Sequence, residues 1–214
     1  MILYSPIDGD VYGKRIQYKP KTCFIATQLA KPIPKEVKNI RNTLYKYLKI
    51  RRIKAIDANS KVTGRDFLIK IWENVIAVPL GIAIVTDELP IKTLENIFYE
   101  IGLLQAFGKE TLIIKMEKVP VPSDFVRTEY IDYDRSFKFK INKYIDTFFE
   151  LADHYYLMAE QLEKDPLLAI DYLERAYLIK KSKKCKEKIK EIFKKNKDSF
   201  KFYTSQKINN LLKF

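Results

Sequence analysis

The stretch GIAIVTDELPIKTLENIFYEIGLLQAFGKETLIIK, residues 81–115, carries the clearest structural pattern in this 214-residue chain. It opens with GIAIVTD (81–87), a continuous apolar run that is typical of a strand in the middle of a parallel sheet. After a short loop, apolar residues recur at helical spacing from about 94 to 107, and Gly108 takes the position of a helix C-cap. TLIIK (111–115) predicts a further strand. The stretch is therefore one strand–helix–strand unit.

The same alternation continues on both sides of this unit. Three short apolar runs predict strands, and two segments with apolar residues every three or four positions predict helices. The strands are 23–27, 53–57 and 129–133, and the helices are 35–48 and 66–78. Such alternation favours a doubly wound α/β fold with a mostly parallel, five-stranded sheet. Ligands of these sheets bind beyond the carboxyl ends of the strands, so the loops that follow the strands are where we expect the site.

The patterns divide the chain into three regions. Residues 1–22 carry Gly and Pro among alternating Tyr and Ile, and we expect an N-terminal extension that forms a loop or a short edge hairpin. Residues 23–140 form the α/β domain. Residues 141–214 are helical and rich in Lys, with a turn at Asp165-Pro166 that starts a new helix.

Part of the helical region resembles a repeat unit. The segment AEQLEKDPLLAIDYLERAY, residues 159–177, has the small-residue and Pro placement of a tetratricopeptide helix pair. Only one such pair is visible, and solenoids need about three repeats to stand alone. A helical cap docked on the α/β domain is therefore our main interpretation, and a dimerisation or partner-docking arm is the alternative.

Composition limits the classes of partner. The formal net charge of +13 attracts phosphates, nucleic acid or anionic lipid. The lysines between 180 and 201 do not keep to one helix face, which favours a solvated helix end over specific nucleic-acid binding. Cys23 and Cys185 show no paired spacing, which argues against a disulfide framework and a thiolate metal site. The sequence has no apolar run of membrane-span length and no signal peptide, so we expect a cytoplasmic protein without a membrane partner.

The familiar phosphate-cradle and nucleophile motifs are missing from the sequence. Neither GxGxxG nor GxxxxGK[ST] occurs, so Rossmann and P-loop chemistry lack their glycine-rich loops. The only histidine, His154, lies in the helical region and is interpreted as structural. Without a second histidine we expect no Ser-His or Cys-His nucleophile system and no His-based metal site. Carboxylates remain as the candidate chemical groups.

Asn96 and Glu100 are the candidates on the helix of the central unit. They are four residues apart, share a helix face, and lie in the half of the helix that begins at the carboxyl edge of the preceding strand. The opposing, core-facing stripe consists of Ile97, Ile101 and Leu104. Gly102 weakens the helix by about 1 kcal/mol relative to Ala, and we expect it to allow close approach of another backbone or a ligand. A solvated surface glutamate is the alternative for Glu100.

Loops after the other strands add binding candidates. Thr27 and Gln28 lie at the mouth of the first strand and either bond a ribose or an amide or cap the loop. Arg65 either meets a phosphate or forms a surface ion pair. Trp72, the only tryptophan, is expected to pack in the core or an interface rather than to stack on a base.

Residues 23–134 resemble the TIR-like and nucleoside 2-deoxyribosyltransferase-like group of nucleotide-cleaving domains. The similar motifs are CFIATQL at the first strand, N-x-x-Y-E-I-G at 96–102, Gly108-Lys109 before the next strand, and P-x-D at 122–124 followed by EYIDY. The resemblance implies a flavodoxin-like, TIR-like nucleotide-binding domain with Glu100 as catalytic residue and Asn96 beside it. Tyr99 belongs to the second of these motifs. Asp87 lies at the end of the strand expected at 81–87, where the group often has an Asp and a Thr, and here Thr86 and Asp87 occur in altered order. Both Tyr99 and Asp87 are further substrate-binding candidates.

The implied activity is that of an NAD(P) N-glycosidase, an NAD hydrolase that uses NAD as substrate and no cofactor. Breaking an N-glycosidic bond builds positive charge on the ribose, and a carboxylate beneath the ring stabilises or traps it. The nicotinamide of NAD is already cationic, so no strong general acid is needed. The resemblance further implies an effector of prokaryotic antiviral defence or signalling that is active as a homo-oligomer.

Three other functions stay open from the sequence. One is a non-catalytic TIR-like module that senses a nucleotide or recruits a protein partner through the helical region. Another is a nucleoside deoxyribosyltransferase-like enzyme. The weakest is nucleic-acid binding through residues 180–201, which a salt titration of binding would detect.

Overall fold

Parallel strands form the central layer of the protein. The computed structural model describes residues 5–6, 8–12, 16–58, 67–117, 119–125, 128–162 and 164–212. Within these residues there are five strands: β1 (Thr22–Ala26), β2 (Lys54–Ile56), β3 (Leu80–Val85), β4 (Glu110–Lys115) and β5 (Glu129–Asp132). They pair in the order β2-β1-β3-β4-β5, and every pair is parallel. This confirms the predicted five-stranded sheet.

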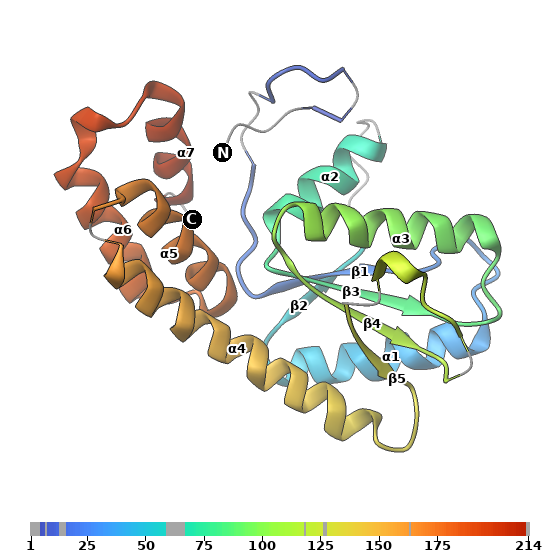
Figure 1. The fold of residues 1–214 in the computed structure, drawn as a ribbon. Coiled ribbons are helices and arrows are strands. Elements are labelled where there is room, and N and C mark those ends of the chain that lie inside the picture. Colours follow the sequence, from blue (N-terminus) through green and yellow to red (C-terminus); the bar gives the residue numbers. More distant parts are fainter. Residues whose placement is uncertain are drawn as a thin grey trace.

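Helices cover both faces of the sheet (Figure 1). The helices α2 (Phe67–Ala77) and α3 (Ile91–Ala106) lie on one face, and α1 (Lys35–Ile50) and the first part of α4 (Phe137–Gln161) lie on the other. An ion pair between Arg51 and Asp146 joins the end of α1 to α4. The predicted doubly wound arrangement is thereby confirmed. The buried stripe of α1 is the expected one: Val37, Ile40, Leu44 and Leu48.

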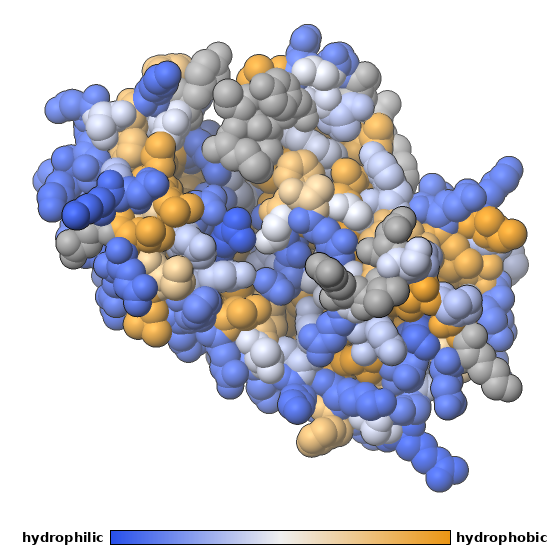
Figure 2. Space-filling model, viewed as in Figure 1, coloured by the Kyte–Doolittle hydropathy of each residue, from blue (hydrophilic) through white to orange (hydrophobic). Residues whose placement is uncertain are grey.

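The helical tail lies beyond the amino ends of the strands (Figure 1). It continues from α4 into α5 (Pro166–Lys180), α6 (Lys183–Lys195) and α7 (Phe202–Leu212); the short 3-10 helix η2 (Lys197–Ser199) precedes α7, and η1 (Ser123–Phe125) precedes β5. One face of α6 is buried through Cys185 and Ile189, its lysines lie on the remaining faces, and the tail surface in the view of Figure 2 carries hydrophilic and apolar side chains. The C-terminal helical region predicted from the sequence is therefore present.

The helices α4 and α5 form an antiparallel pair that turns at Asp165-Pro166, as predicted. The Asp165 carboxylate accepts a hydrogen bond of 3.1 Å from the amide of Leu168, and Pro166 opens the helix. Further from the turn, the Tyr155 and Tyr172 rings lie 5.9 Å apart.

Helix α4 belongs to both parts of the molecule. It begins at Phe137, before the boundary expected at residue 141, and its first half is buried against the sheet through Ile141, Ile145 and Phe148. Its second half packs against α5, where Ala159 is buried. One continuous helix therefore connects the α/β region to the tail.

The segment before β1 runs between α2 and the tail. The Lys19 amide donates to the Ala77 carbonyl at 2.8 Å, and the Lys21 amide donates to the Leu178 carbonyl of α5 at 2.8 Å. The rings of Tyr12 and Trp72 pack edge to face, with their centroids 4.6 Å apart. Trp72 is 3% exposed, so its predicted packing role is confirmed. This part of the N-terminal extension is a loop that packs against the fold.

Two glycines in the central unit have opposite surroundings. A Cβ on Gly81 of β3 would lie 2.1 Å from a methyl carbon of Leu104, whereas a Cβ on Gly102 would meet no protein atom within 4 Å among the described residues. Leu104 is fully buried and cannot easily move aside. The prediction that Gly102 allows another backbone to approach closely is therefore wrong. The glycine against which α3 packs is Gly81 of β3.

This difference predicts opposite effects of the same substitution. Gly81→Ala should lower the free energy of unfolding by about 1–3 kcal/mol, because Leu104 or the α3 backbone must shift. Gly102→Ala should raise it by up to about 1 kcal/mol, because alanine favours a helix interior and meets open space. Denaturant titration of both variants measures these changes. A Gly81→Ala protein as stable as wild type would contradict the close contact between α3 and β3.

Candidate functional site

The carboxyl ends of the strands meet the first turns of α1 and α3 at one edge of the sheet, here called the carboxyl edge. The neighbouring strands β1 and β3 lead into helices on opposite faces, since α1 leads to β2 and α3 leads to β4. Connections that diverge in this way open a crevice between the two strands, where ligands of doubly wound sheets bind. Thr27 and Gln28 follow β1 at this edge, and Thr86 and Asp87 follow β3.

Glu100 is held against the sheet by the packing of α3. Leu104 lies against Gly81, and Glu100 is one turn earlier on the same row of the helix, nearer the carboxyl edge. Its side chain is mostly buried. Desolvation, followed by repulsion from the negative charge of Asp57, raises the pKa of the Glu100 carboxyl to about 8. Glu100 therefore holds a proton at neutral pH.

Asp57 is the neighbour that the sequence interpretation missed. It directly follows β2, and its charge acts on two helices: on Glu100 of α3 and, after the effect of burial, on the phenol of Tyr45 in α1, whose pKa it helps to raise. Asp57 ends the apolar run IKAID, so it is the first polar residue at the carboxyl end of a strand. That position was the signal available in the sequence.

Three buried oxygens at the carboxyl edge have no hydrogen-bond partner among the described residues: Thr27 Oγ1, Gln28 Oε1 and Thr86 Oγ1. The amide nitrogen of Gln28 donates to the carbonyls of Ala30 and Pro32 at 3.0 and 2.9 Å, so Gln28 caps the loop after β1. Buried polar atoms normally have partners. The three oxygens are therefore suited to bind hydroxyl or amide groups of a ligand.

The remaining predicted site residues are less closely grouped. Asn96 and Tyr99 of α3 are exposed, so Glu100 alone of the three side chains is turned toward the interior. Asp87 is exposed in the loop between β3 and α3. Arg65 lies outside the described residues. The charge of Asp57 thus acts on Glu100, whereas Asn96 is exposed to solvent.

Two helices begin at the carboxyl edge without a side-chain cap. Pro34 and Pro90 occupy the N-cap positions of α1 and α3, and neither provides a side-chain hydrogen bond to the first turn. The free amides and the helix dipole favour negative groups at such ends. Exposed Lys31 and Lys35 flank the start of α1. The first turns of α1 and α3 at the carboxyl edge therefore favour an anionic ligand.

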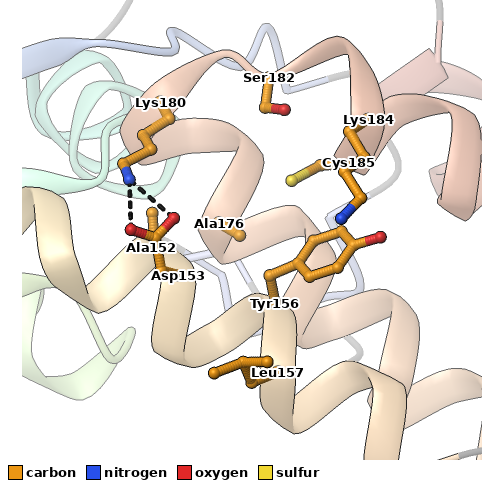
Figure 3. Close-up of a pocket in the computed structure, with 9 residues that line it drawn as sticks. All are labelled: Ala152, Asp153, Tyr156, Leu157, Ala176, Lys180, Ser182, Lys184 and Cys185. Atoms are coloured by element: carbon orange, nitrogen blue, oxygen red, sulfur yellow. Dashed lines mark hydrogen bonds and ion pairs between the residues drawn. The ribbon is translucent and has the colours of Figure 1, made fainter.

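A cavity of about 250 Å³ lies in the tail, away from Glu100 (Figure 3). Its walls carry the Asp153–Lys180 ion pair, at 2.6 Å, and Lys184, whose ammonium is 4.2 Å from the centroid of the Tyr156 ring. Burial raises the pKa of the nearby Cys185 thiol, which stays protonated at neutral pH. This cavity therefore offers no activated nucleophile.

The described ranges contain neither a metal-ligand cluster nor a membrane-spanning helix. No group of three His, Cys, Asp or Glu side chains there is placed to hold a metal ion. Among the helices described, none combines the length and the apolar character needed to cross a membrane.

The Glu100 carboxyl makes the stability of the protein depend on pH. Its folded-state pKa of about 8 lies above the ordinary value of 4.5, so the folded state binds more protons between these pH values. The free energy of unfolding therefore falls as the pH rises through this window. Glu100→Gln removes the titrating group. We expect the free energy of unfolding of this variant to exceed that of wild type by about 2–4 kcal/mol at pH 8.5 and to equal it near pH 4.

Chemical denaturation at both pH values measures this difference. Glu95→Gln is the matched control, because Glu95 is exposed on the same helix, and it should unfold like wild type at both pH values. Equal stability of wild type and Glu100→Gln at pH 8.5 would show that Glu100 is solvated.

The sequence matches no known protein-family model, and no curated protein is significantly similar to it.

Proposed function

We propose that the protein cleaves the N-glycosidic bond of a nucleotide at the carboxyl edge, with NAD or NADP as the preferred substrate and Glu100 as the catalytic carboxylate. The observation that carries the proposal is the mostly buried Glu100, which faces the negative charge of Asp57. A buried carboxyl group that is also repelled by a second negative charge is unfavourable for folding. Groups perturbed in this way concentrate at functional sites.

The reaction needs a negative group at the ribose. In NAD the bond joins a ribose carbon to the positively charged nicotinamide nitrogen. When the bond breaks, its electron pair stays with the nicotinamide, which leaves as a neutral molecule, and positive charge develops on the ribose. A carboxylate beside that carbon stabilises the charge or captures the carbon as an ester, which water then hydrolyses.

The protonated state of Glu100 is compatible with this role. A nearby positive charge favours the charged form of a carboxyl group and lowers its pKa. Binding of a cationic nicotinamide would therefore drive the Glu100 proton to solvent and generate the carboxylate only when substrate is present. Asp57 would add to the negative potential at the ribose.

Other features of the carboxyl edge support a nucleotide as the ligand. The uncapped first turns of α1 and α3 favour phosphate groups. The buried oxygens of Thr27 and Thr86 are suited to ribose hydroxyls, and Gln28 Oε1 is suited to an N–H donor such as a carboxamide. All of these groups lie where the strands β1 and β3 end.

A second candidate reaction is cleavage or transfer at a neutral nucleoside, in the manner of a nucleoside deoxyribosyltransferase. A neutral base leaves poorly until it is protonated. With a pKa of about 8, Glu100 holds the proton that such a base requires. Glu100 would then donate its proton to the departing base nitrogen, and Asp57 would stabilise the ribose cation.

The first test is nicotinamide release from NAD by the purified full chain, over a range of protein concentrations so that assembly is covered. Glu100→Gln keeps the shape and removes the charge, and we expect a loss of about 10²-fold or more in kcat/KM. Glu95→Gln should retain wild-type activity. If wild type releases neither nicotinamide from NAD nor base from nucleosides, the enzyme proposal fails and a nucleotide-sensing module takes its place.

The pH profile separates the two reactions. If Glu100 acts as a carboxylate on NAD, kcat/KM rises with pH and levels off above about 8, the pKa of that group in the free protein. If Glu100 acts as an acid on a nucleoside, kcat/KM falls as the pH rises through the same value. Profiles measured with both substrates from pH 6 to 10 decide between them. A flat profile for both would show that Glu100 takes no part in the chemistry.

A further inference from the structure

A second cavity, of about 290 Å³, lies at the amino edge of the sheet, opposite to Glu100. The end of α3 and the start of β4 form one side of it, and α5 and α7 form the other. It therefore separates the α/β region from the helical tail. Both apolar and charged side chains line it.

The most deeply buried acid in this cavity has two partners. Glu174 of α5 is 8% exposed and accepts a hydrogen bond from the hydroxyl of Tyr18. The ammonium of Lys207 in α7 lies 3.4 Å from its carboxylate. The negative charge of Glu174 is therefore already compensated.

The two other acids of the cavity are also engaged. Asp171 pairs with the Nε of Arg175 at 3.0 Å. The Glu110 carboxylate accepts a hydrogen bond of 3.0 Å from the Tyr155 hydroxyl. Asp171 and Glu174 are thus each paired with a cation, whereas the Tyr155 hydroxyl is neutral and leaves Glu110 without an ion-pair partner among the described residues.

Lys109 is the charged side chain of this cavity that lacks a partner. Among the described residues its ammonium makes no hydrogen bond and no ion pair, although the side chain is mostly buried. Burial lowers its pKa to about 8, and the charges of Lys207 and Arg175 act in the same direction against the attraction of Glu174. An uncompensated positive charge in such a place is unfavourable, and a bound anion would relieve it.

The cavity offers a second cationic donor and an apolar wall. A Cβ on Gly108, next to Lys109, would lie 3.3 Å from Nη1 of Arg175, so the guanidinium reaches the backbone beside Lys109. Guanidinium groups carry several N–H donors that match the two oxygens of a carboxylate. The apolar part of the lining consists of Ile76, Pro79, Ala106, Phe107, Leu178 and Ile179.

We propose that this cavity binds a small organic monocarboxylate, whose carboxylate meets Lys109 and Arg175 and whose carbon chain packs on the apolar wall. The cavity lining carries three positive charges and three negative charges: Lys109, Arg175 and Lys207, and Glu110, Asp171 and Glu174. A monocarboxylate beside the unpaired Lys109 therefore adds one buried negative charge, whereas a phosphate dianion would add two. The volume is at the small end of ligand sites, which limits the ligand to a compact molecule. This site is independent of the reaction proposed at the opposite edge.

Calorimetric titration of the full chain with acetate, butyrate and benzoate, at constant ionic strength in sodium chloride, tests the site. We expect saturable binding of at least one carboxylate, about tenfold or more tighter than its neutral amide, because one charge-assisted contact is worth about that factor. Lys109→Met should weaken this binding by about tenfold or more. Lys92→Met, which removes an exposed lysine from the start of α3, should not change it.

The pH dependence provides a readout that does not depend on any substitution at Lys109. Affinity should fall by about tenfold per pH unit above the Lys109 pKa of about 8, since the neutral amine no longer attracts the carboxylate. The other groups that face the cavity are Tyr18, Glu110, Tyr155, Asp171, Glu174, Arg175 and Lys207. The measurement is made in the Glu100→Gln background, because Glu100 also titrates near pH 8.

NMR of the Lys109 side chain in ¹³Cε-lysine-labelled protein completes the test. Its pKa should rise when the carboxylate is bound and should stay unchanged with the amide. The proposal is overturned if no carboxylate of the set saturates, if the amides bind equally well, or if Lys109→Met keeps wild-type affinity. Tighter binding of inorganic phosphate than of every carboxylate would overturn the monoanion assignment.

Discussion

The contact between Leu104 of α3 and Gly81 of β3 is the constraint on which the arrangement of the carboxyl edge depends. Without a side chain on Gly81, the helix approaches the strand closely enough for Leu104 to fill the space. That approach brings Glu100, one turn earlier, out of solvent and next to the charge of Asp57. A helix held further from the sheet would carry the same glutamate in water, with an ordinary pKa. The chemistry proposed for this edge is therefore a result of backbone packing.

Much of the fold was predictable from local sequence patterns. Continuous apolar runs identified the strands, and periodic apolar residues identified α1, α2 and α3, because burial on one or both sides is recorded in the residues themselves. Asp165-Pro166 marked the turn between α4 and α5 for the same reason: capping is a local interaction. The start of α4 was placed too late, although Phe137 lies four residues before Ile141 on the buried stripe of the helix and belongs to its periodic pattern.

The candidate site was predictable only in part. Glu100 was identified from helical spacing and from a motif, but Asp57, whose charge acts on it, follows the strand β2, and no local pattern states which strands become neighbours. Gly102 attracted attention because glycine is unusual within a helix, whereas Gly81 in a strand gave no such signal, although it makes the close contact. The unpaired state of Lys109 was likewise unpredictable, because it depends on which partners the tail supplies to every other charge in the cavity.

Helix α4 is a 25-residue helix, about 37 Å long, and it has consequences for how the molecule responds to force and heat. Its first half packs against the sheet and its second half against α5, within one continuous hydrophobic core, while the amide of Lys21 links the segment before β1 to α5. The two regions are thus linked twice, by the chain itself within α4 and by the hydrogen bond from Lys21 to Leu178. A hinge at a single linker is incompatible with this arrangement. The tail and the sheet are therefore mechanically one body, in which local melting of either region strains the other and cooperative unfolding is favoured over swinging.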